Sequence, residues 1–300
     1  MEGGKAMINF HKYSFLDCKK LKRYIENDDY WICQYNPIWL FVWSDYYKPE
    51  ICFRHDFVFI RFMMPDVGMC YYPPLGKGDL KQAMKDMEED AKERGFDFYL
   101  APVAESLYPH VSRLSDKLYE NRDFDTYICS SDALSFFKEK EYKEKRKLCE
   151  KFEKQHRDAV YKPIKKDDFG LILEFITDWN QEHSDQYNTP YFYKQLNMIK
   201  KCMDHLYELD LFGIILMDEK KVYGVAIASL IGNVATLHVN LSLDSIPGAA
   251  EELMQCFART TSLRARYISL EMDSGDLVER KKKSSYKPVK LEKYYATFNL

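Results

Sequence analysis

Two carboxylates and two cations stand close together near the end of the chain, in the order Glu271, Asp273, Arg280 and Lys283. The stretch Ala265–Met272 is predicted to be a strand, and side chains two residues apart on a strand point to the same face. Because neighbouring like charges raise the pKa of one carboxyl group, the pair predicts a general base. The alternative is that both carboxylates cap the next helix or pair with Arg280 and the lysines.

The cations are predicted to lie on a helix that Asp276 opens. On that helix Arg280 and Lys283 are three residues apart and share a face. A cationic face beside carboxylates suits a phosphate group. Ser285 and Tyr286 follow directly, and they are expected either to bind the ligand or to anchor the tail of the chain.

The elements that must position these residues begin with a predicted set in the first half of the chain. This set is a helix over 14–27, strands over 39–43, 51–53, 57–63 and 69–72, a helix over 80–94 and a strand over 96–103. Asp79 is the expected N-cap of the second helix and Gly95 its expected end.

The second half repeats this order of elements. It has predicted helices over 169–182 and 191–208, strands over 212–217, 222–230 and 234–241, a helix over 246–261 and a strand over 265–272. The repetition predicts an α/β (α+β) fold of two duplicated units. The expected domains are residues 1–132 and 133–300, the second beginning with a long linking helix over 133–157.

A loop of small residues precedes the later helix of each half, at Gly76–Gly78 and at Gly248–Ala250. Small residues at a helix N-terminus leave backbone N–H groups free to bind an anion. This arrangement resembles the GNAT acyltransferase fold, whose loop holds the pyrophosphate of acyl-coenzyme A, so Gly248 and Ala250 are candidate cofactor contacts. Pro73 and Ser245 stand where that fold has Gln or Arg, and an ordinary tight turn is the alternative.

The C-terminal stretch also matches a longer motif. It resembles the closing pattern of the domain family named after the C-terminal domain of phosphatidylglycerol lysyltransferase. The matching residues are Glu271, Asp273, Gly275, Arg280, Lys283, Ser285, Tyr286 and Pro288. Glu279 departs from the pattern, since the family usually has Leu at that position.

Two upstream segments resemble the same family in part. The first matches at Leu134, Lys145, Arg146 and Phe152, but Lys147 and Glu150 stand where the family has Asn. The second keeps His238, whereas Asn240 and Leu241 stand where the family has Glu and Lys. The resemblance marks Lys145, Arg146 and His238 as further substrate-binding candidates.

The resemblance implies two tandem GNAT-like domains, each a mixed, mostly antiparallel sheet flanked by helices. It also implies kinship with transferases that move an amino acid from aminoacyl-tRNA to an acceptor. Such transfer requires a base but no metal and no resident cofactor, with aminoacyl-tRNA or acyl-CoA as co-substrate. Two alternatives stay open: an inactive descendant that binds a ligand or partner, and an acetyl-CoA-dependent N-acetyltransferase.

Basic residues gather in two segments of a chain whose net charge is −3. The segment Lys138–Lys166 has 12 Lys or Arg against six Asp or Glu, and Arg280–Lys293 has seven against one. If the two segments lie together, they form a basic surface suited to tRNA. Mutual pairing of Lys and Glu along an exposed helix explains the first segment equally well.

Cysteine usage and hydropathy predict a cytoplasmic protein without a membrane-spanning segment. The eight Cys include no CxxC pair, and the seven His include no HxH or HExxH, so a metal site is not expected. The most apolar stretch, Gly224–Leu237, is shorter than the roughly 20 residues needed to span a bilayer. The first residues have no apolar run typical of a secretory signal.

Overall fold

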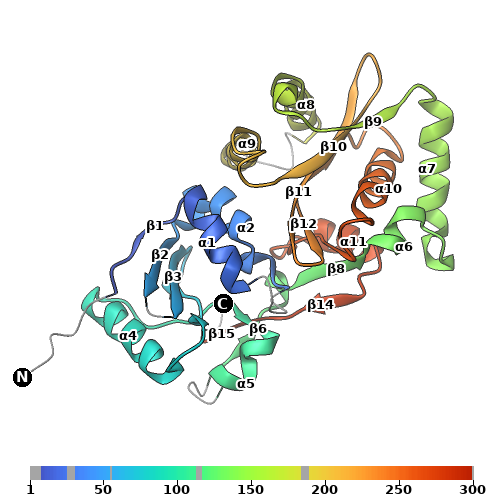
Figure 1. The fold of residues 1–300 in the computed structure, drawn as a ribbon. Helices are drawn as coiled ribbons and strands as arrows, with labels where there is room; N and C mark the ends of the chain where they lie inside the picture. Colours follow the sequence, from blue (N-terminus) through green and yellow to red (C-terminus); the bar gives the residue numbers. More distant parts are fainter. Residues whose placement is uncertain (1–7, 26–30, 55, 113–116, 184–188, 299–300) are drawn as a thin grey trace, which may run out of the picture. The chain divides into compact units, whose positions relative to one another are not determined.

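Mostly antiparallel sheets flanked by helices make up the computed structural model, which describes residues 8–25, 31–54, 56–112, 117–183 and 189–298 (Figure 1). The described residues divide into two compact units. Unit 1 takes its residues from 1–126, 272–275 and 292–300, and unit 2 from 127–271 and 276–291. The predicted fold class is confirmed, and each unit is described by itself below.

Unit 1 is built on an antiparallel sheet in the order β1-β2-β3-β4, with β5 also pairing β3, and on a small sheet in the order β6-β15-β7. The strands are β1 (His11–Lys12), β2 (Glu50–Arg54), β3 (Phe57–Met64), β4 (Gly68–Tyr71), β5 (Leu75–Gly76), β6 (Val103–Ala104), β7 (Tyr119–Glu120) and β15 (Tyr294–Ala296). The helices are α1 (Phe15–Ile25), α2 (Pro37–Val42), α3 (Ser44–Tyr47), α4 (Leu80–Glu93) and α5 (Tyr108–Val111).

Helix α4 forms where its end signals predicted it. The Asp79 carboxylate accepts a hydrogen bond from the backbone N–H of Gln82, and Gly95 follows the helix with a φ of 73°. Its buried face, with Ala83 and Met87, packs into an apolar cluster with residues of β3 and β4 such as Phe59 and Tyr71.

Two strand predictions in unit 1 are wrong. Residues 39–42 belong to helix α2, with Trp43 as its C-cap. The helix begins here because the Asn36 side chain accepts hydrogen bonds from the backbone N–H groups of Ile38 and Trp39 and Pro37 occupies the first helical position. Of residues 96–103, only Leu100 makes a ladder contact, a parallel bridge to Tyr71, before β6 begins.

Unit 2 is built on a seven-stranded sheet in the order β14-β8-β13-β12-β11-β10-β9. The strands are β8 (Thr126–Ser130), β9 (Val160–Pro163), β10 (Phe212–Met217), β11 (Val222–Ile231), β12 (Val234–Ser242), β13 (Tyr267–Ser269) and β14 (Lys290–Glu292). The helices are α6 (Ser131–Phe136), α7 (Lys143–Gln155), α8 (Phe169–Glu182), α9 (Thr189–Asp204), α10 (Ala249–Thr261) and α11 (Leu277–Ser285).

Helix α10 connects two strands of this sheet that pair over only part of their length. It joins β12 to β13, which run parallel and pair only from Val234–Tyr267 to Thr236–Ser269, although β12 continues to Ser242. Helix α10 covers one face of β10, β11 and β12, and α8 and α9 lie on the other face (Figure 1). Strand β12 therefore extends beyond its parallel partner.

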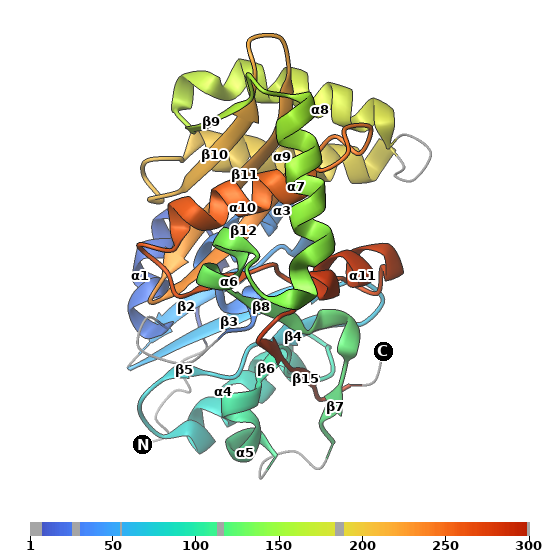
Figure 2. The same cartoon turned by 90° about the vertical axis from the view of Figure 1, so that its right-hand side faces the viewer.

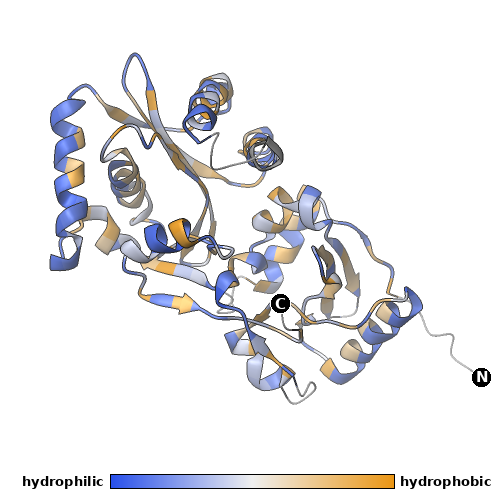
Figure 3. Ribbon diagram, turned by 180° about the vertical axis from the view of Figure 1, so that it is seen from behind, coloured by the Kyte–Doolittle hydropathy of each residue, from blue (hydrophilic) through white to orange (hydrophobic). Residues whose placement is uncertain are grey.

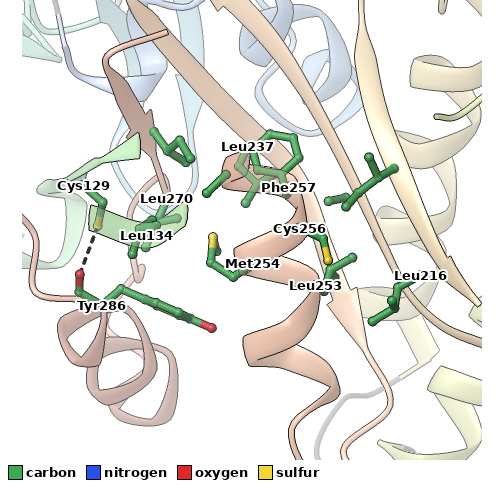
Figure 4. Close-up of a cluster of buried hydrophobic side chains, with 14 of the residues drawn as sticks. Cys129, Leu134, Leu216, Leu237, Leu253, Met254, Cys256, Phe257, Leu270 and Tyr286 are labelled. Atoms are coloured by element: carbon green, nitrogen blue, oxygen red, sulfur yellow. Dashed lines mark hydrogen bonds between the residues drawn. The ribbon is translucent and has the colours of Figure 1, made fainter. Parts of the chain in front are cut away.

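The main core of unit 2 lies between α10 and the sheet. Buried side chains of α10 such as Leu253, Met254 and Phe257 meet Leu216 of β10 and Leu237 of β12 (Figure 4). Ala226 and Ala228 of β11 point to the face that α10 covers. Because successive side chains of a strand point to opposite faces, Ser229 points to the face that α8 and α9 cover.

The predicted linking helix over 133–157 is interrupted. Helix α6 ends at Phe137, which has a left-handed φ of 48°, and a 3₁₀ turn over Lys140–Tyr142 leads into α7. Helix α7 then runs past α10, and α11 lies beside the lower end of α7 in Figure 2. In the part of the chain that the structure describes, no helix is long and apolar enough to cross a bilayer.

Candidate active site

His238 lies at a β-bulge in the central part of the unit 2 sheet. Val239 pairs with Ile227 and Leu237 pairs with Ala228, so His238 is an extra residue of β12 with no partner on β11. A bulge of this kind bends the strand and re-aims a side chain, and bulges are frequent next to active sites. The bulge directs His238 to the same face as Ser229.

Ser229, His238 and Glu271 form a continuous hydrogen-bonded chain. His238 Nδ1 lies 2.9 Å from Glu271 Oε1, and His238 Nε2 lies 2.8 Å from Ser229 Oγ. An ionised carboxylate only accepts hydrogen bonds, so Nδ1 is the nitrogen that donates to Glu271, while Nε2 faces the Ser229 hydroxyl. The chain holds both the His238 ring and the Glu271 carboxylate in position.

Glu271 is the member of this chain that solvent reaches. Its side chain is 14% exposed, whereas the His238 side chain is fully buried at 0%. Both ring nitrogens of His238 are occupied, but Glu271 Oε2 makes no hydrogen bond within the part of unit 2 that the structure describes. The carboxylate oxygen Oε2 is therefore the atom best placed to take a proton from a ligand.

The backbone at Glu271 departs from the expected strand. Strand β13 ends at Ser269, and Glu271 has a left-handed φ of 58°, which is rare for a residue with a branched or long side chain. The prediction of a strand up to Met272 is wrong, and the rule that placed Glu271 and Asp273 on one strand face does not apply. The left-handed turn brings the Glu271 carboxylate to His238.

Asp273 contacts Arg122 and Gly275, which belong to unit 1 as it does. Its side chain is fully buried, its Oδ2 lies 3.5 Å from Arg122 Nη1, and its Oδ1 accepts a hydrogen bond from the Gly275 backbone N–H. Gly275 has a φ of 82°, and a Cβ there would lie 3.0 Å from Asp123 Oδ2. These contacts place Asp273 and Gly275 in a tight turn before α11. A structural role of this kind resembles the alternative in which the carboxylate caps the next helix.

The predicted helix with Arg280 and Lys283 is present as α11. The Asp276 carboxylate accepts hydrogen bonds from the backbone N–H groups of Val278 and Glu279. Lys283 lies 4.0 Å from Glu279, and Ser285 Oγ donates to the carbonyl oxygen of Lys282. Ser285 thus completes the end of α11, while a ligand role for Arg280 and Lys283 stays a prediction.

Lys145 and Tyr286, taken from two separate motif segments, pack against each other in unit 2. The Lys145 Nζ lies 3.6 Å from the centre of the buried Tyr286 ring and 3.5 Å from Glu251 Oε1. Burial lowers the pKa of Lys145, against the opposing effect of Glu251. Tyr286 also accepts a hydrogen bond from the Tyr142 hydroxyl through its carbonyl oxygen. The contact between Lys145 and Tyr286 therefore connects α7 to the end of α11.

Arg146 has a similar local role. Its guanidinium donates to the carbonyl oxygens of Phe137 and Glu139, which lie at and beyond the C-terminus of α6. A cation that binds the last carbonyl groups of a helix stabilises that helix end. The contacts of Lys145 and Arg146 therefore give both residues a structural reason to be present.

The loop at Gly248 and Ala250 opens α10 against the backbone of α7. Gly248 has a φ of 88°, and a Cβ at this position would lie 2.2 Å from the carbonyl oxygen of Leu148. Glu251 and Glu252 follow in the first turn of α10, where their charge opposes a bound phosphate. Close packing accounts for the glycine, and cofactor binding at this loop stays a prediction.

Ser229 is the site residue that sequence reasoning did not identify. It is the single polar residue of the otherwise apolar run Gly224–Leu230, and no motif surrounds it. Only the bulge at His238 and the turn at Glu271 bring the three side chains together. The polar residue in the apolar strand was the one available signal.

The chain is similar in sequence to a described protein family. The family model described as phosphatidylglycerol lysyltransferase, C-terminal, matches residues 31–297. No curated protein is matched by this sequence.

Solved structures with a similar fold include three that span nearly the whole chain. A conserved protein of unknown function from Bacteroides thetaiotaomicron VPI-5482 has a TM-score of 0.89 at 25% identity, covering 98% of this chain and 100% of that one. L-PGS from Bacillus licheniformis has a TM-score of 0.64 at 11% identity, covering 93% and 91%. FemX has a TM-score of 0.56 at 9% identity, covering 96% and 95%.

Proposed function

Because the chain belongs to the phosphatidylglycerol lysyltransferase C-terminal family, we propose that it is an acyltransferase that moves an amino acid from aminoacyl-tRNA to an acceptor. The observation that carries this proposal is the Glu271 carboxylate, held by His238 and with Oε2 left for a ligand. The family supports the reaction class, and the site supports the residue that performs the proton transfer.

The proposed reaction requires one base and no covalent intermediate. The acceptor amine or hydroxyl attacks the ester carbonyl carbon of the aminoacyl-tRNA, and Glu271 Oε2 takes the proton that the acceptor loses. The bond between that carbon and the terminal ribose oxygen then breaks, and the protonated Glu271 returns the proton to this oxygen. His238 donates to Glu271 throughout and keeps the carboxylate oriented, and Ser229 holds His238 in turn.

We further propose that tRNA phosphates contact the basic segment Lys138–Lys166. On α7 the exposed residues Lys143, Lys147, Lys151 and Lys154 recur every three or four positions, so they form one stripe along the helix. Lys147 lies 2.9 Å from Glu144, a surface pair that contributes little to stability and can exchange for a phosphate.

A duplication of an ancestral unit, with residues 1–132 and 133–300 as the two copies, is part of the same proposal. Unit 1 has α1, the meander β2–β4, α4 and the parallel bridge at Leu100. Unit 2 has α8 and α9, the meander β10–β12, α10 and the parallel strand β13. Both units thus have the same order of elements, and in both a parallel pairing follows the later helix. This similarity supports a common origin.

One alternative rests on a specific observation. Asn240 and Leu241 follow His238 on β12, at positions where the resemblance implies Glu and Lys. A catalytically inactive protein that binds a ligand is consistent with these replacements. An acetyl-CoA-dependent enzyme is less well supported, because Gly248 packs against α7 and two glutamates follow it.

The donor test separates these functions. Bulk tRNA charged with labelled amino acids is incubated with the protein and with either phosphatidylglycerol vesicles or a dipeptide amine as acceptor, and acetyl-CoA is tested in parallel by thermal shift. Enzyme-dependent transfer of the label to one acceptor supports the proposal. A thermal shift with acetyl-CoA and no transfer indicates an acetyltransferase, and a folded protein that is silent in both assays indicates the inactive alternative.

A further inference from the structure

A groove of about 830 Å³ in unit 1 contains none of the residues assigned to the transfer reaction. One of its walls is a face of α4 on which the lining residues recur every three or four positions. These residues are Lys81, Met84, Lys85 and Glu88. Figure 3 shows hydrophilic blue beside hydrophobic orange along α4. Pockets for small molecules measure about 300–1,000 Å³, so the groove has the size of a ligand site.

A second wall of the groove carries two aromatic side chains that the fold holds in place. Phe98 packs against Tyr71 with 5.5 Å between the ring centres, and Tyr99 packs against Phe298 with 5.3 Å between them. Helix α4 is fixed as well, because its other face packs into the apolar cluster of unit 1. Both walls are therefore formed before a ligand arrives, and the aromatic one favours a flat ring.

The charged side chains of the groove include both signs. Lys81 and Lys85 lie one turn apart on α4, and neither forms an ion pair within the part of unit 1 that the structure describes. The same holds for Glu88, one turn beyond Lys85. The Asp79 carboxylate is engaged as the N-cap of α4, and Lys117, which also lines the groove, has a contact of its own. A ligand with one anionic and one cationic group complements this wall.

The spacing of these charges indicates the length of the ligand. The midpoint between Lys81 and Lys85 is five residues from Glu88, which corresponds to a rise of about 7.5 Å along the helix. Two residues of extended peptide span about 7 Å. A dipeptide can therefore place its carboxylate at the two lysines while its ammonium group reaches the glutamate.

We propose that this groove binds a zwitterionic dipeptide with an aromatic side chain. The carboxylate of the dipeptide lies between Lys81 and Lys85, and its ammonium group lies on Glu88, so that each end makes a charge-assisted hydrogen bond. Its ring packs against Phe98 and Tyr99. A ligand with anionic groups alone fits less well, because the Glu88 carboxylate repels a second anion. The inference does not depend on the transfer reaction.

The test is isothermal titration of the full chain with glycyl-phenylalanine and three analogues. N-acetylglycyl-phenylalanine lacks the ammonium group, glycyl-phenylalaninamide lacks the carboxylate, and glycyl-alanine lacks the ring. Glycyl-phenylalanine is expected to bind about fivefold or more tightly than each analogue, because each analogue loses one of the three contacts. Added salt should weaken its binding. No binding of glycyl-phenylalanine, or equal binding of all four peptides, would overturn the proposal.

Substitutions matched to the analogues locate each end of the peptide. Glu88→Gln is expected to weaken glycyl-phenylalanine about fivefold and to leave the N-acetyl analogue unchanged, because that analogue has no ammonium group. Lys81→Gln/Lys85→Gln is expected to weaken glycyl-phenylalanine and to leave the amide analogue unchanged. A Glu88→Gln variant that weakens both of its peptides equally would contradict the direct contact.

The matched control is Lys19→Gln/Lys92→Gln, which neutralises two exposed lysines of unit 1 that do not line the groove. It is expected to bind glycyl-phenylalanine as the parent does, with the same melting temperature. If this control weakened the peptide as much as Lys81→Gln/Lys85→Gln does, the effect would be one of net charge and the assigned site would be wrong.

Discussion

Glu271 and Asp273 belong to one sequence motif, yet their contacts differ in kind. Glu271 places one carboxylate oxygen on the buried ring of His238, and its other oxygen makes no hydrogen bond among the residues of unit 2 that the structure describes. Asp273 is fully buried, lies beside Arg122 and accepts the backbone N–H of Gly275. At the residue scale, the motif therefore combines one residue suited to chemistry with a turn that holds the backbone around it.

Asp273→Ala tests this assignment through stability. The substitution removes the acceptor of the Gly275 N–H and one of the carboxylates beside Arg122, so it is expected to lower the free energy of unfolding of unit 1 by about 1–3 kcal/mol. Urea unfolding measures the effect. Glu93→Ala removes an exposed carboxylate of α4 and should change stability little. If Asp273→Ala were as stable as the parent, the structural role assigned to Asp273 would be contradicted.

Much of the site could be predicted at the level of residue types, but not its connections. Glu271 and His238 were marked by the motif resemblance, and the helix with Arg280 and Lys283 followed from Asp276. The strand over 265–272 was predicted too long, because Glu271 leaves the strand with a left-handed φ and contacts His238, 33 positions away. The role of Ser229 could not be predicted for the same reason. Its local sequence indicates only an apolar strand, and its contact with His238 depends on the β-bulge.

At the scale of elements, α10 connects the two parallel strands of unit 2 and must begin close to α7. Gly248 allows this approach, since its φ is 88° and the Leu148 carbonyl oxygen occupies the place of a Cβ. The sequence predicted the helix and its small-residue start; the structure shows close packing of the helices there, and phosphate binding at this loop stays a prediction. Local residue types do not distinguish the two, because both require a small residue at a helix N-terminus.

Gly248→Ala is expected to destabilise unit 2. The left-handed backbone and the overlap with Leu148 each oppose a side chain, and a strained residue costs about 1–3 kcal/mol. Thermal and urea unfolding measure the loss. Gly170→Ala is the control, since α8 has open space around that position and Ala favours a helix over Gly. A Gly248→Ala variant as stable as Gly170→Ala would show that α7 moves away from α10 at little cost.

At the scale of the whole molecule, both units bury their thiols. All eight cysteines are buried thiols outside any disulfide. Burial raises the pKa of Cys18, Cys70, Cys129 and Cys202 to about 12 in each case, and for Cys202 the nearby Glu271 carboxylate adds a smaller effect. The folded chain therefore keeps protons on these thiols at a pH where the unfolded chain loses them.

This difference predicts alkaline destabilisation. The stabilising effect is complete below the ordinary thiol pKa of about 9 and declines as the pH rises from there towards 12. Each such thiol lowers the free energy of unfolding by about 1.4 kcal/mol per pH unit above 9. Urea unfolding under reducing conditions at several pH values measures the slope. Cys202→Ala should make it shallower, whereas an unchanged slope would contradict the assignment for that thiol.

The central claim is that Glu271 is the base of an aminoacyl transfer reaction, and single-turnover transfer by Glu271→Gln tests it most directly. The amide keeps the size of the side chain and an oxygen for His238 Nδ1–H, but it cannot take a proton. The rate is therefore expected to fall by about 10²–10⁴-fold, with unchanged tRNA affinity and unchanged melting temperature. Transfer by Glu271→Gln at the parent rate would contradict the account.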